Sequence, residues 1–114
     1  MKAEIWHNPR CSKSRQTLAL LEEQGAEVKV VLYLENPPSK SRIEKVLKLL
    51  GGEAIQLVRT KEAEWKATGL DKSASKKAIV EALVETPKLI ERPVVITDKG
   101  AVIGRPPENV LTVL

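Results

Sequence analysis

The sequence is poor in cysteine, histidine and aromatic residues. It contains one cysteine, one histidine and no phenylalanine, and aromatic residues make up 3% of its 114 residues. A single cysteine excludes an internal disulfide and leaves a cysteine-based metal site short of ligands, so we expect no bound metal. No apolar run approaches the ~18 residues of a membrane span, and the residues after Met1 do not resemble a signal peptide. We therefore expect a cytoplasmic protein without a membrane partner.

The positive charge is spread over the chain instead of concentrated in one patch. Residues 1–57 carry nine basic and seven acidic side chains, and residues 58–114 carry ten and eight, which gives the net charge of +4. Nucleic-acid-binding domains usually cluster their basic residues, and single-strand binders add aromatic rings for stacking. We expect no nucleic-acid partner. The length and the 42% of hydrophobic residues predict a single domain over residues 1–114. We also expect a monomer.

Hydrophobic periodicity predicts an α/β fold. Strands are expected at residues 3–7 and 28–34, and as an antiparallel hairpin at 93–97 and 101–104. Helices are expected at residues 12–24 and 39–50, in short pieces near 53–58 and 62–66, from 73 or 75 to 86, and from 106 or 107 to the C-terminus. The order is β-α-β, a helical insertion at about 39–90, and β-β-α. This is the thioredoxin-like arrangement, with a mixed four-stranded sheet.

The only cysteine lies where the first strand gives way to the first helix. Asn8-Pro9 interrupts the strand, Cys11 follows, and helical composition begins at Ser12. The first backbone N–H groups of a helix lack intrahelical partners and favour an anion, either a thiolate or a bound oxyanion. Basic neighbours at Arg10, Lys13 and Arg15 act in the same direction. A lone cysteine is often only a small buried hydrophobe, but these polar flanks favour a reactive Cys11.

Five blocks are distinctive in sequence and in order. They are His7-Asn8-Pro9-x-Cys11-x-x-Ser14-Arg15, the segment from Leu32 to Ser39, Leu57-Val58-Arg59, Glu91-Arg92-Pro93-Val94-Val95 and Gly104-Arg105-Pro106. Together they resemble the glutaredoxin-coupled arsenate reductase (ArsC-like) family from near residue 3 to the C-terminus. Because the chain ends at Leu114, the similarity is to the short, YfgD-type members.

The resemblance implies a function and a set of site residues. It implies that Cys11 attacks arsenate, that glutathione enters as a co-substrate with no bound cofactor, and that glutaredoxin then releases arsenite. The residues matching the family's oxyanion-binding arginines, which also hold the cysteine as thiolate, are Arg59, Arg92 and Arg105. The matching supporting residues are His7 and Ser14, assigned to orienting the loop and hydrogen-bonding the sulfur, and Pro93, which matches a cis-proline.

Stereochemistry supports these assignments unequally. Pro93 restrains Arg92 to extended conformations, and Arg105 stands between a glycine and a proline, so both occupy stiff backbone. Their planar guanidinium groups suit bidentate contacts with a tetrahedral oxyanion. Arg59 lies in a weakly patterned helical piece and would be interpreted as a solvated side chain without the resemblance. His7 is equally compatible with a structural role.

Two other functions remain open from the sequence. The same fold occurs in Spx-like regulators, which bind RNA polymerase and sense oxidation with a Cys-x-x-Cys pair. Here Ser14 takes the second position, so only a binding role independent of that switch would remain. The other alternative is a monothiol oxidoreductase that acts on another oxyanion or on a glutathione adduct, which would not need three arginines.

Overall fold

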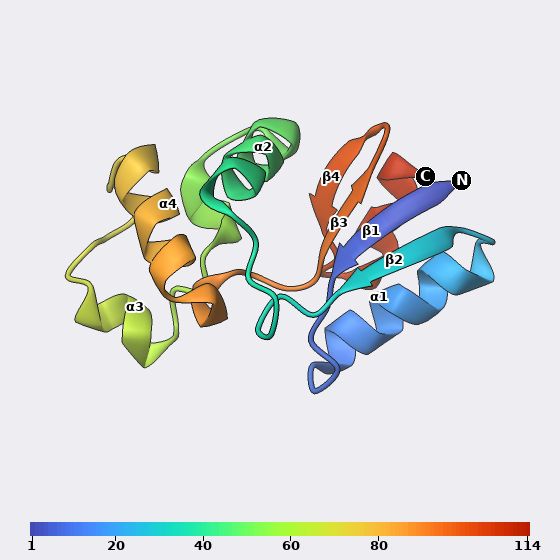
Figure 1. Cartoon of the computed structure of the whole chain (residues 1–114), viewed down its shortest axis with the longest axis horizontal. Coiled ribbons are helices and arrows are strands. Elements are labelled where there is room, and N and C mark those ends of the chain that lie inside the picture. Colours follow the sequence, from blue (N-terminus) through green and yellow to red (C-terminus); the bar gives the residue numbers. More distant parts are fainter. The chain divides into compact units, whose positions relative to one another are not determined.

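The computed structural model describes residues 1–114 (Figure 1). The elements in chain order are β1 (Lys2–Trp6), α1 (Ser12–Glu23), β2 (Glu27–Val31), α2 (Lys40–Leu50), the 3-10 helix η1 (Ala54–Leu57), α3 (Ala63–Ala67), α4 (Lys76–Glu85), the 3-10 helix η2 (Pro87–Leu89), β3 (Val94–Thr97), β4 (Gly100–Ile103) and the 3-10 helix η3 (Pro107–Val113). The contacts divide the chain into two compact units. The first unit comprises Met1–Asn36 and Arg92–Leu114, and the second comprises Pro37–Glu91.

The first unit contains the whole sheet, in the strand order β2-β1-β3-β4. β1 pairs with β2 in parallel, and β1 with β3 and β3 with β4 pair antiparallel. Ile5, in the centre of β1, lies opposite Val30 on one side and Val95 on the other. The mixed four-stranded sheet and the C-terminal hairpin are therefore confirmed.

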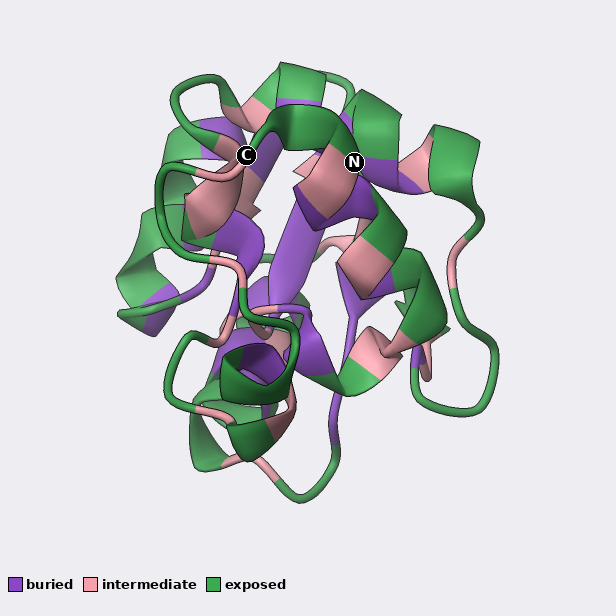
Figure 2. Cartoon of the chain, turned by 90° about the vertical axis from the view of Figure 1, so that its left-hand side faces the viewer, coloured by how far each residue is buried: buried purple, intermediate pink, exposed green.

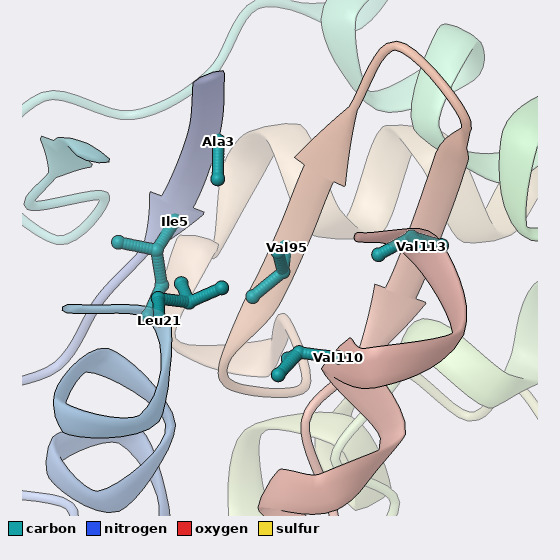
Figure 3. Close-up of a cluster of buried hydrophobic side chains, with 6 residues drawn as sticks. All are labelled: Ala3, Ile5, Leu21, Val95, Val110 and Val113. Carbon is teal, nitrogen blue, oxygen red and sulfur yellow. The ribbon is translucent and has the colours of Figure 1, made fainter. Parts of the chain in front are cut away.

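One face of this sheet forms a hydrophobic core with α1 and η3 (Figure 3). Alternation along a strand places Ala3 and Ile5 on the same face, where Val95 of β3 joins them. α1 contributes Leu21, and η3 contributes Val110 and Val113. Each fully buried valine, leucine or isoleucine side chain stabilises the fold by about 1.5–3 kcal/mol. The predicted final helix is present, but it is a 3-10 helix.

The second strand is shorter than predicted. β2 ends at Val31, and the Leu32 carbonyl accepts hydrogen bonds from the N–H groups of Glu35 and Asn36, at 2.9 and 2.8 Å. The chain therefore turns before the proline pair instead of continuing extended to residue 34. Val30 and Leu34 are 44% and 49% exposed. Residues 28–34 were predicted as one strand because the apolar alternation continues through them. The alternation does not show where the turn begins.

The second unit is the helical insertion predicted at about 39–90. Ser39 begins α2 by accepting a hydrogen bond from Arg42 N–H, and Ser75 begins α4 in the same way with Ala78 N–H, both at 3.2 Å. α2 ends at Gly51, whose φ of 68° suits glycine. Buried and exposed residues alternate around these helices (Figure 2). That residues 1–114 form a single domain stays a prediction.

Candidate functional site

A short built turn carries the chain from β1 to the cysteine. His7 N–H donates to the Val31 carbonyl at 2.9 Å, which anchors the end of β1 to β2. Arg10 N–H then donates to Asn8 Oδ1 at 2.9 Å, and Cys11 N–H donates to the Asn8 carbonyl at 3.0 Å. Cys11 is the N-cap residue of α1, with extended backbone. The strand-to-helix position predicted for the cysteine is confirmed.

Four donors surround the half-buried Cys11 sulfur. Backbone N–H groups of Ser14 and Lys13 donate to it from the first turn of α1, and the Arg92 side chain hydrogen-bonds to it. Arg105 Nη1 donates from 3.8 Å. Burial alone would raise the pKa of Cys11, but the N–H groups of Ser14 and Lys13 and the hydrogen bond and charge of Arg92 outweigh it. The pKa of Cys11 is therefore below that of an ordinary cysteine, and the thiolate is favoured.

Arg92 connects this sulfur to a residue that the sequence analysis missed. The Arg92–Pro93 peptide bond is cis, and β3 begins directly after it. The pKa of Arg92 is raised, although burial would lower it, because the guanidinium interacts with the Cys11 sulfur and with the hydroxyl of Tyr33. Tyr33 is fully buried in the turn after β2. A buried tyrosine hydroxyl needs a polar partner. The presence of a tyrosine in an otherwise apolar run was therefore the one signal in the sequence for this contact.

Arg105 is held by an unusually close approach of backbone to side chains. Its Nη1 also donates to the Arg92 carbonyl at 3.4 Å. The preceding Gly104 has no room for a side chain, because a Cβ there would lie 2.7 Å from Thr17 Oγ1 and 2.9 Å from Pro93 Cγ. Glycine is thus required for this close packing, and the packing fixes the backbone that carries Arg105 after the end of β4.

The Ser14 hydroxyl contacts two groups of the turn between β1 and α1. It accepts a hydrogen bond from Asn8 N–H at 3.0 Å and lies 2.6 Å from His7 Nδ1. Burial and the charge of Arg15 lower the pKa of His7, so the neutral ring can accept the hydroxyl hydrogen at Nδ1. That the hydroxyl also hydrogen-bonds the Cys11 sulfur stays a prediction. Ser14 is fully buried and contributes its backbone N–H to Cys11.

Arg59 belongs to the second unit, where carboxylates surround it. Its Nε donates to Glu62 Oε1 and its Nη1 to Glu91 Oε1, both at 3.2 Å. Arg59 N–H also donates to the Leu89 carbonyl at 2.8 Å, beside an antiparallel bridge between residues 58 and 90. The structure thus brings Cys11, Arg92 and Arg105 together, whereas a contribution of Arg59 to the same site stays a prediction.

Two further properties bear on what the site can bind. No three histidine, cysteine, aspartate or glutamate side chains in the chain are grouped as metal ligands. No helix is both long and apolar enough to cross a membrane. What the first unit offers is a nucleophilic sulfur with adjacent N–H and guanidinium donors, which suits attack on a small oxyanion.

The resemblance seen in the sequence is confirmed by comparison with known proteins. The model of the ArsC family matches residues 6–113. The uncharacterized protein YfgD of Escherichia coli K12 is 50% identical over 115 residues, which cover 99% of this chain and 97% of the relative. An arsenate reductase of Haemophilus influenzae is 44% identical over the whole of both chains. The solved arsenate reductase of Vibrio cholerae is 46% identical, covers 100% of this chain and 98% of its own, and superposes with a TM-score of 0.94. The chain therefore belongs to the ArsC family.

Proposed function

We propose that this protein is an arsenate reductase in which the Cys11 thiolate is the nucleophile. The observation that carries the proposal is the set of donors on one sulfur: two N–H groups at the start of α1 and the side chains of Arg92 and Arg105. Full-length similarity to relatives that bear this name supports the same activity. The donors stabilise the anionic nucleophile, and they also suit the oxygens of its substrate.

The first step forms a sulfur–arsenic bond. The Cys11 thiolate attacks arsenate, one oxygen leaves as water after protonation, and arsenic stays in the +5 state. Arg92 and Arg105 bind the remaining oxygens, and the N–H groups at the start of α1 add to this stabilisation. In this proposal Arg59 is the third oxyanion-binding arginine, and its ion pairs with Glu62 and Glu91 hold its side chain in one orientation.

The electrons come from thiols outside this chain. Cys11 is the only cysteine and is free, so no second sulfur of the chain can complete a disulfide. Glutathione condenses with the adduct, forming a second sulfur–arsenic bond and releasing water. A glutaredoxin thiolate then attacks the glutathione sulfur, so that a mixed disulfide forms and the electron pair of the broken bond reduces arsenic to the +3 state. Hydrolysis of the remaining bond releases arsenite and restores Cys11.

Arsenite release measured with arsenate, glutathione and glutaredoxin tests the proposal. We expect release by the wild type and none by Cys11→Ser, because a serine hydroxyl fits the space but does not form the thiolate nucleophile. Both proteins should melt at similar temperatures at pH 7. No release by the wild type would overturn the proposal. Release that is independent of glutaredoxin would keep the reaction and overturn the assigned reductant.

A further inference from the structure

Thr17 is a buried polar residue that the proposed reaction does not use directly. It lies in the second turn of α1 and is fully buried. Its Oγ1 donates to the Lys13 carbonyl at 2.8 Å, a common bond within helices. The same Oγ1 also lies 3.2 Å from the Gly104 carbonyl, 87 residues away in the sequence. A single hydroxyl hydrogen therefore serves two carbonyls from distant segments.

Both carbonyls belong to segments that hold the Cys11 sulfur. Lys13 donates its backbone N–H to the sulfur. Gly104 is bonded to Arg105, whose Nη1 is 3.8 Å from the sulfur. The hydroxyl thus joins the helix turn that supplies N–H donors to the segment that supplies a guanidinium.

The contact between Thr17 and Gly104 leaves little freedom. Gly104 N–H donates to the Pro93 carbonyl at 2.9 Å, which fixes one side of the segment. On the other side, the space where a Cβ would stand is bounded by Thr17 Oγ1 at 2.7 Å and Thr17 Cγ2 at 2.9 Å. A change in the shape or polarity of Thr17 is therefore transmitted to the backbone that carries Arg105.

We propose that Thr17 is a positioning residue, whose hydroxyl keeps Arg105 in place beside the Cys11 sulfur. This inference rests on the proposed function only in taking Cys11 as the reactive atom. The test measures the alkylation of Cys11 and not arsenate reduction. The inference can therefore be supported or overturned even if the protein never reduces arsenate.

The rate of Cys11 alkylation by iodoacetamide against pH, with and without sulfate, tests the role of the hydroxyl. Thr17→Val keeps the shape and removes the donor, so we expect the Cys11 pKa to rise by about half a pH unit, which leaves about threefold less thiolate below both pKa values. Sulfate should also protect less. Thr17→Ser keeps the donor and should restore most of both properties. If Thr17→Val does not fold, Thr17→Ala compared with Thr17→Ser gives the same contrast.

Thr97→Val is the matched control. Thr97 is also buried in the first unit, and its Oγ1 donates to the Val113 carbonyl at 2.6 Å. Loss of the Thr97 hydroxyl should lower the melting temperature about as much as loss of the Thr17 hydroxyl, without changing the Cys11 pKa. Equal effects of Thr17→Val and Thr97→Val on Cys11 would show general loosening and overturn the proposal.

A double variant tests whether Thr17 acts through Arg105. In an Arg105→Ala background, Thr17→Val should produce no further change in Cys11 pKa or in sulfate protection, because the group it positions is gone. Additive effects would show that Thr17 acts on the sulfur through the first turn of α1 and not through Arg105. An unchanged Cys11 pKa in the Thr17→Val single variant would show that Thr17 does not act on the sulfur. Either result would overturn the inference.

Discussion

The arginines of the two units lie in opposite electrostatic environments. In the first unit, Arg92 and Arg105 both donate to the Cys11 sulfur, and Arg92 lowers its pKa. In the second unit, Arg59 already has two carboxylates at 3.2 Å. A guanidinium has five N–H donors, so two ion pairs still leave donors for a ligand, but they compensate its charge. Membership of a matching motif therefore does not make the three arginines equivalent, and we expect them to contribute unequally to anion binding.

The largest expected effect is that of Arg92→Ala. Sulfate or arsenate should slow Cys11 alkylation in the wild type, and Arg92→Ala should weaken this protection about tenfold or more, because a charge-assisted contact is worth about 1.5–3 kcal/mol. It should also raise the alkylation pKa. Arg92→Lys should recover only part of both, since an ammonium keeps the charge and loses the planar fork. Arg42, half-buried on α2 in the second unit, gives the control. An equal response from Arg42→Ala would show that the protection comes from general electrostatics and not from a specific site.

Gly104→Ala should break the arrangement in the first unit by crowding. The added methyl group would lie 2.7 Å from Thr17 Oγ1, and such overpacking costs about 1–3 kcal/mol, roughly 4 °C of melting temperature for each kcal/mol. Gly25→Ala is the comparison, because nothing lies within 4 Å and only its φ of 78° opposes a side chain, at a cost of about 1 kcal/mol. Calorimetry and alkylation should show both variants destabilised but only Gly104→Ala with a raised Cys11 pKa. A Gly104→Ala variant with wild-type alkylation would contradict the close packing described above.

Arg59→Ala should have a smaller effect on anion protection than Arg92→Ala. Because Glu62 and Glu91 compensate its charge, we expect a loss of about threefold, measured by the same sulfate-protected alkylation. A loss as large as that of Arg92→Ala would show that an oxyanion displaces the carboxylates. No loss would remove Arg59 from the proposed site.

The smallest effect is a difference in the pH dependence of stability. The folded-state pKa of Cys11 is lowered, so its contribution is fully present above the unfolded value of about 8.5 and is lost as the pH falls through the folded value. The melting temperature of the wild type relative to Cys11→Ser should therefore increase between neutral pH and pH 9. A constant difference over this range would mean that the folded protein does not favour the thiolate.

The sequence predicted those features that depend on neighbours in the chain. The extent of α2 follows from its hydrophobic periodicity, and the position of Cys11 follows from the break at residues 8 and 9. The partners of Tyr33 and Thr17 could not be predicted, because Arg92 and Gly104 approach them only when distant segments pack. For Ser14 the resemblance implied a hydrogen bond to the sulfur, but a motif match does not say which atom of a residue makes a contact. The structure shows its backbone N–H donating to Cys11 and its hydroxyl in contact with His7 and Asn8.

The span of sequence that holds the sulfur has a consequence for newly made chains. Arg105 is 94 residues from Cys11 in the sequence, and Arg92 lies just before β3, which pairs with β1. Contacts of such separation form late, since the chain between them must first lose its freedom. Until then the Arg92 guanidinium does not act on the thiol, and only the N–H groups at the start of α1 can lower its pKa. The full thiolate character of the sulfur is therefore a property of the completed native state.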